Sequence, residues 1–180
     1  MNKSALLVID VQHGLLDLEP RPLEADEVVG RINRLAAQAR KAHCPVVFIQ
    51  HERAGSPLEH GCDFWQLAHG LVIEATDRLV RKTTPDSFMR TTLEALLRES
   101  GVGHVVVTGY ASEFCVDTTT RRAAGLGFTV TLAADAHTTH DKPHASAAQI
   151  RAHENATLPG MVSFARPIVA MPTADIRFEP

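Results

Sequence analysis

Short apolar runs alternate with segments of helical periodicity along all 180 residues, and this alternation constrains the fold more than any other feature. The runs predict strands at residues 5–9, 46–49, 79–82, 104–108 and 128–133, with a last strand between 161 and 170. The segments between them predict helices over 26–43, 87–100, 115–124 and 144–158. Runs such as 105–107, three consecutive valines, are apolar on both faces, which is typical of strands covered by helices on both sides.

Strands that alternate with helices favour right-handed crossover connections and a parallel sheet. We therefore expect a doubly wound α/β fold with three layers, α/β/α. A hydrophobic content of 44% and a length of 180 residues are sufficient for one core, so a single domain over residues 1–180 is predicted. In such sheets ligands bind at the carboxyl ends of the strands, where the strand order reverses. The residues directly after each strand are therefore the candidates for a site.

Charge and hydropathy exclude several functional classes. The net charge is −3 and the basic residues are scattered, which argues against a nucleic-acid partner. No apolar stretch reaches the ~18 residues of a membrane span, so no membrane partner is expected. The apolar run at the N-terminus is too short for a signal peptide, and the chain has only three cysteines. These two features predict a reduced, cytoplasmic protein.

Three residues with chemically active side chains lie at or after the carboxyl ends of three different predicted strands: Asp10, Lys82 and Cys115. Taken singly, each has an ordinary explanation: an aspartate that caps a turn, a solvated lysine, a small buried thiol. Taken together, they supply what thiol chemistry needs. A thiol attacks a carbonyl as the thiolate, and a helix start such as the one predicted at Cys115 favours an anion.

The same three residues divide the chemical tasks between them. Asp10 can accept the thiol proton, and Lys82 supplies the positive charge that lets a carboxylate and a thiolate lie side by side. The backbone N–H of Cys115, with that of Ala111 or Ser112, can form an oxyanion hole.

Four segments carrying these residues resemble the isochorismatase-like cysteine hydrolase superfamily: 6–12, 81–88, 107–119 and 133–137. The resemblance implies a six-stranded parallel sheet of Rossmann-like order 3-2-1-4-5-6 and a triad of Asp10, Lys82 and nucleophile Cys115. It also implies a cis peptide between Tyr110 and Ala111, which directs the Ala111 N–H into the oxyanion hole. Members of this superfamily are usually homo-oligomers, so a dimer or tetramer is expected.

Departures from the resemblance narrow the predicted reaction. Isochorismatases, which cleave a vinyl ether, lack the nucleophilic cysteine, so Cys115 favours acyl chemistry on an amide or ureide. Nicotinamidases carry Asp-x-His after the second strand, where this chain has Gln50, His51 and Glu52. No metal or other cofactor is therefore expected, and the loop residues His51, His60, His69 and Cys62 match no common zinc spacing.

The prediction is thus a cysteine hydrolase that cleaves a C–N bond of a small molecule through a thioester. The alternatives are a vinyl-ether hydrolase of the isochorismatase type and a non-catalytic thiol sensor or binding protein. Six residues are candidates for substrate binding: Gln12, His51, Trp65, Phe88, Tyr110 and Glu113. For three of them another reading stays open: Trp65 as a loop anchor, Phe88 as a core residue, and Glu113 as a residue facing solvent or a partner subunit.

Overall fold

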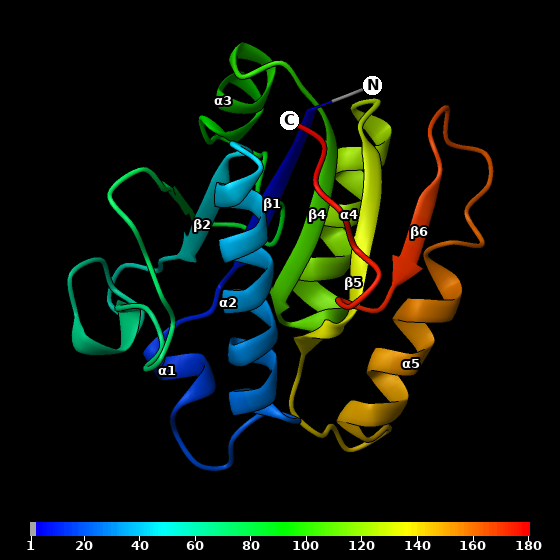
Figure 1. Ribbon diagram of the computed structural model, residues 1–180. Helices are drawn as coiled ribbons and strands as arrows, with labels where there is room; N and C mark the ends of the chain where they lie inside the picture. The colour runs from blue at the N-terminus through cyan, green and yellow to red at the C-terminus, as the bar shows by residue number, and fades with distance from the viewer. Residues whose placement is uncertain (1–2) are drawn as a thin grey trace.

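The computed structural model describes residues 3–180 and contains one parallel six-stranded sheet (Figure 1). The strand order is β3-β2-β1-β4-β5-β6, which confirms the predicted topology. The strands are β1 (Lys3–Ile9), β2 (Val46–His51), β3 (Arg78–Lys82), β4 (Val102–Tyr110), β5 (Thr129–Thr138) and β6 (Ile168–Met171). The order reverses between β1 and β4, which pair in register from Ser4 with His104 to Ile9 with Gly109.

Helices connect the strands and surround the sheet. Their bounds are α1 (His13–Leu16), α2 (Ala25–Lys41), α3 (Leu93–Glu99), α4 (Asp117–Gly125) and α5 (Ala147–Thr157), with a 3-10 turn η1 (Asp63–Trp65) and a π-helical turn η2 (Ser112–Val116). None of the helices in residues 3–180 has the length and apolar character needed to cross a membrane.

Alternate side chains of the buried strands point to opposite faces and form two cores. One core joins Leu7, Ile9 and Val107 to α3 and α4; the other joins Leu6 and Val8 to α2. In Figure 1 helix α2 lies in front of the sheet and α4 behind it, and the C-terminal segment crosses the same face as α2. Because β1 and β4 are covered on both faces, the residues that follow them are held in fixed positions.

The helix predicted over 87–100 begins later than expected, at Leu93. The side chain of Asp86 accepts hydrogen bonds from the backbone N–H groups of Phe88 and Met89, which builds a turn instead of a helix start. Arg90 then adopts a left-handed backbone with φ of 58°. Ser87, the first residue of the predicted helix, bonds instead to Thr119, with 2.8 Å between the hydroxyl oxygens.

Two further boundaries differ from the sequence prediction. Strand β5 continues to Thr138, so Asp135 and His137 lie within the strand and not in a loop after it. Helix α5 begins at Ala147 because Ser146 and Gln149 form a reciprocal capping box. The short elements α1 and η1 were not predicted, because four and three residues are too few to show a periodicity.

Gly109 is the tightest backbone contact between the two central strands, and it provides a stability test. Its φ is 115°, and a Cβ there would lie 2.0 Å from the carbonyl oxygen of Ile9. We expect Gly109→Ala to lower the free energy of unfolding by at least about 3 kcal/mol, measured by chemical denaturation.

Gly101→Ala is the matched control. Gly101 also has a positive φ, 71°, but no atom lies within 4 Å of its would-be Cβ. Only the left-handed strain remains, so the expected loss is about 1–2 kcal/mol. Equal losses in the two variants would show that the approach of β4 to β1 is not the constraint.

Candidate active site

Asp10 follows directly on β1, at the point where the strand order reverses. Its backbone N–H still donates to the Ile49 carbonyl at 2.8 Å, but its φ is 52°, so the chain turns away from the sheet here. The carboxylate is almost completely buried, and its Oδ2 accepts a hydrogen bond from Lys82. Strained non-glycine residues of this kind persist where surrounding structure holds them, and they cluster at functional sites.

Lys82 is the last residue of β3, two strands away from β1, and its side chain is completely buried. Its Nζ lies 2.7 Å from Asp10 Oδ2, 3.2 Å from the Thr84 carbonyl oxygen and 3.2 Å from Cys115 Sγ. An ammonium has three protons to donate, and these are its three nearest partners; His51 Nδ1 lies farther away, at 3.4 Å. The carboxylate and the thiol are thus joined through one buried cation.

Cys115 lies in η2, between β4 and α4. The turn brings a half-buried thiol to the carboxyl edge of the sheet, where the residues after β1 and β3 also lie. The three residues that the sequence analysis singled out are therefore neighbours in space, although they are 33 to 105 positions apart in the chain.

The thiol is protonated in the resting protein. Burial, and after it the negative charge of Asp10, raise the pKa of Cys115 to about 12, although the ammonium of Lys82 partly opposes both effects. The helix start, which the sequence analysis expected to favour a thiolate, does not outweigh burial. At neutral pH the site therefore holds a thiol beside an ion pair.

The expected oxyanion hole has two candidate donors, the backbone N–H groups of Ala111 and Cys115. The peptide between Tyr110 and Ala111 is cis, and among residues 3–180 the structure shows no acceptor for the Ala111 N–H. Ala111 and Cys115 both line the cavity that holds Asp10. Both residues thus border the space in which a carbonyl oxygen would lie.

A chain of buried hydrogen bonds holds Ser112, the first residue of η2, in place. The Ser112 hydroxyl and Nδ1 of His137 lie 2.8 Å apart, and His137 Nε2 lies 3.0 Å from Asn155 Oδ1. Burial lowers the pKa of His137 to about 4, so the ring is neutral. It then accepts from the Ser112 hydroxyl and donates to the Asn155 side chain. This role of His137 was not predicted, because the apolar run of the fifth strand ends at residue 133 and leaves His137 in an expected loop.

A cavity of about 230 Å³ opens beside the thiol. Its polar groups come from Asp10, His51 and Cys115, and most of the remaining wall is apolar. Residues 15, 58, 85 and 114 complete this wall, and the sequence analysis missed them: Leu15, Leu58, Pro85 and Phe114. Only Phe114, adjacent to Cys115, carried a signal in the sequence, because Leu15 comes from α1 and the other two from loops.

Two of the six candidates for substrate binding line this cavity. His51 places Nδ1 3.4 Å from the Lys82 ammonium, and burial followed by that positive charge lowers its pKa. Tyr110 bonds through its hydroxyl to His140 at 2.9 Å, and burial raises the pKa of the phenol to about 12. Both side chains are therefore uncharged at neutral pH.

The other four candidates do not line it. Gln12 is fully buried and bonds to backbone groups of His51 and Trp65, so its polar atoms hold the scaffold. Trp65 lines a second cavity of about 700 Å³, to which Lys82 also contributes. Phe88 stacks on Phe128 in the core.

Glu113 borders a different cavity, of about 440 Å³, beside α5. Its Oε1 accepts from Thr139 and lies 3.3 Å from the Lys142 ammonium.

The fold and the site together define a class of protein: a doubly wound α/β protein with a carboxylate, a lysine and a thiol at the switch point of its sheet. The Isochorismatase domain matches residues 4–159, and the chain belongs to the isochorismatase family.

Individual relatives agree with this assignment. Streptothricin hydrolase from Streptomyces noursei is 39% identical over 142 residues, which are 78% of this chain and 51% of that protein, so the chain spans about half its length. Ureidoacrylate amidohydrolase from Enterobacter sp. (strain 638) is 28% identical over 155 residues, 66% of this chain and 67% of that protein. The crystal structure of an isochorismatase from Pseudomonas putida KT2440 is 30% identical with a TM-score of 0.85, covering 97% of this chain and 90% of that one.

The raised pKa of Cys115 predicts how the thiol reacts with iodoacetamide. Because the thiolate forms only as the pH approaches about 12, the labelling rate of Cys115 should still be rising at about pH 10. Peptide mapping by mass spectrometry after timed labelling would measure this rate, with the exposed Cys62 as an accessible thiol in the same sample.

Asp10→Asn is the informative variant, because it removes the negative charge but leaves the side-chain shape. Labelling of Cys115 near pH 8 should then become faster than in the unaltered protein. A rate for the unaltered protein that already levels off below about pH 8.5 would mean that the thiolate exists at rest.

Proposed function

We propose that this chain is a hydrolase that cleaves the C–N bond of a small amide or ureide through a thioester on Cys115. The observation that carries the proposal is the shared cation: Lys82 Nζ lies within hydrogen-bond distance of both Asp10 Oδ2 and Cys115 Sγ. Hydrolase and amidohydrolase are words in the names of two relatives, which supports this class of reaction.

In the first step Asp10 removes the thiol proton while sulfur attacks. Asp10 Oδ1 is buried and, within residues 3–180, has no hydrogen-bond partner, so it is the oxygen available to take the proton. The sulfur electron pair forms the S–C bond, and the carbonyl oxygen becomes an oxyanion. The N–H groups of Ala111 and Cys115 stabilise that charge.

In the second step the tetrahedral intermediate collapses and the C–N bond breaks. Asp10 passes its proton to the leaving nitrogen, which departs as ammonia or an amine. Asp10 then takes a proton from a water molecule that attacks the thioester, and the acid product leaves as the thiol is restored. Lys82 stabilises the carboxylate before each proton transfer and the sulfur anion as it develops.

The cavity restricts the substrate to a small molecule. A volume of about 230 Å³ is below the usual range of ligand pockets, about 300–1,000 Å³. The mostly apolar wall suits an apolar or uncharged substituent on the acyl side.

Homo-oligomerisation and a cytoplasmic location stay predictions.

The two alternatives are less compatible with this site. A redox-sensing cysteine is usually an exposed thiol of low pKa, whereas burial raises the pKa of Cys115 to about 12. Vinyl-ether hydrolysis needs no nucleophilic thiol, so a cysteine held against Asp10 and Lys82 would have no role in it.

The central variant is Cys115→Ala, assayed for ammonia or amine release on a panel of small amides and N-carbamoyl compounds. Turnover should fall by at least about 10³-fold because the nucleophile is lost, while the circular dichroism spectrum and Tm stay close to those of the unaltered protein.

Cys62→Ala is the matched control, because Cys62 is exposed and does not line the cavity beside Cys115, and it should retain full activity. Near-normal turnover by Cys115→Ala would contradict the mechanism. Isochorismate cleavage that survives in Cys115→Ala would favour the vinyl-ether reaction.

A further inference from the structure

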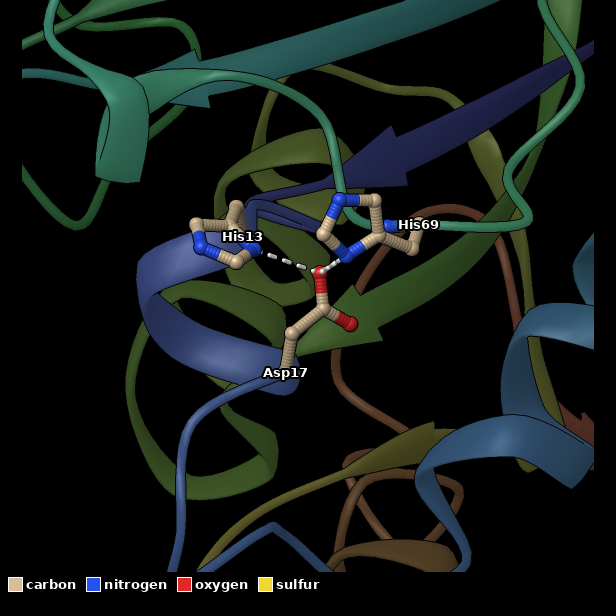
Figure 2. Close-up of side chains that lie close together, drawn as sticks. All are labelled: His13, Asp17 and His69. Carbon is tan, nitrogen blue, oxygen red and sulfur yellow. Dashed lines mark hydrogen bonds and ion pairs between the residues drawn. The ribbon is translucent and has the colours of Figure 1, made fainter.

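Two histidines and an aspartate meet outside the active site, where α1 contacts the long loop that precedes β3 (Figure 2). His13 begins α1, Asp17 follows its last residue, and His69 comes from the loop. Nδ1 of His13 lies 2.9 Å from Asp17 Oδ2, and Nδ1 of His69 lies 3.0 Å from the same oxygen. None of the three residues belongs to the proposed catalytic group.

Three nitrogen atoms of this cluster approach a single carboxylate oxygen. Asp17 Oδ2 faces both imidazole Nδ1 atoms and also accepts the His69 backbone N–H at 2.9 Å. Figure 2 shows both rings directed at that single carboxylate oxygen. A neutral imidazole that loses its Nδ1 proton by tautomerisation presents a lone pair there, which is a metal ligand.

The spacing fits a bound ion. The three ligand atoms all lie within 4.8 Å of one another. Ligands about 2.0–2.1 Å from a tetrahedral zinc ion are about 3.3 Å apart. The two N–O separations, 2.9 and 3.0 Å, are close to that spacing, and the two Nδ1 atoms lie within 4.8 Å of each other. We propose that His13, Asp17 and His69 bind one divalent cation of the zinc type through two nitrogens and one oxygen.

A second observation supports the assignment. The other ring nitrogen of His13, Nε2, lies 3.5 Å from a carboxylate oxygen of Asp63 in η1. Histidines that bind a metal commonly donate their second N–H to a carboxylate, which orients the ring and makes it a stronger ligand. Asp63 therefore occupies the position of an outer partner. Because the side chain of His69 is 81% exposed, water can complete the coordination.

The ion would tie the loop to α1 and so brace the wall of the active site. The loop already joins α1 through the His13 N–H, which donates to the Gln66 carbonyl at 2.8 Å, and α1 contributes Leu15 to the cavity beside the thiol. This role is structural, and it does not depend on the proposed reaction. The spacing of His69 and the other loop residues predicted no metal, and the approach of His69 to α1 is not visible in the sequence.

The test uses Zn²⁺ as the probe and the chelator-treated full chain in isothermal titration calorimetry at about pH 7.5. The unaltered protein should bind one Zn²⁺ per chain, and Zn²⁺ should raise its Tm. His69→Ala, which removes an exposed ligand, should weaken Zn²⁺ binding at least about tenfold and abolish the rise in Tm. His144→Ala, at an exposed histidine of another surface, is the matched control and should bind like the unaltered protein.

Two further readouts separate a metal site from a simple hydrogen-bonded contact. Co²⁺ should give visible d–d absorption with the unaltered protein and His144→Ala but not with His69→Ala. Asp63→Ala should weaken Zn²⁺ binding by about tenfold, because it removes the outer partner of His13. Absence of Zn²⁺ binding to the unaltered protein, or equal affinity in His69→Ala, would overturn the proposal.

Discussion

The buried ion pair between Asp10 and Lys82 is the interaction on which the rest of the site depends. The two charged atoms lie 2.7 Å apart and both side chains are almost completely excluded from water. Burying two ions is costly, and breaking such a pair by removing one partner typically costs about 3–5 kcal/mol, because the remaining charge has no compensation. The cost is offset only while the ends of β1 and β3 stay in place. The order of the sheet, with β2 between these strands, therefore sets the geometry of the site.

The same pair determines the state of the thiol. Cys115 shares the Lys82 ammonium with Asp10, yet burial and the carboxylate keep it protonated at neutral pH. A protonated thiol beside a carboxylate differs from the thiolate–imidazolium pairs of other cysteine enzymes, because its proton moves only as the S–C bond forms. In this account the resting enzyme is unreactive towards adventitious electrophiles, and substrate binding in the cavity precedes activation.

Much of the fold was predictable because the apolar runs of a covered parallel sheet are visible in the sequence. The residues after the strands were predictable for the same reason, and Asp10, Lys82 and Cys115 do lie together. The sequence could not show the start of α3, which depends on a side-chain turn at Asp86. It also could not show that the side chain of Gln12 forms hydrogen bonds with backbone groups, or that His69 approaches α1. Both contacts depend on the path of a loop that has no periodicity in the sequence.

The most direct test of the account is the detection of the acyl-enzyme itself. Turnover of a small amide or ureide would be quenched with acid within the first catalytic cycles, and the peptides would be mapped by mass spectrometry. The account predicts the mass of the acyl group on the peptide that carries Cys115, and its absence from the peptides that carry Cys44 and Cys62. Turnover that continues while Cys115 never carries an acyl group, under conditions that preserve thioesters, would contradict the account.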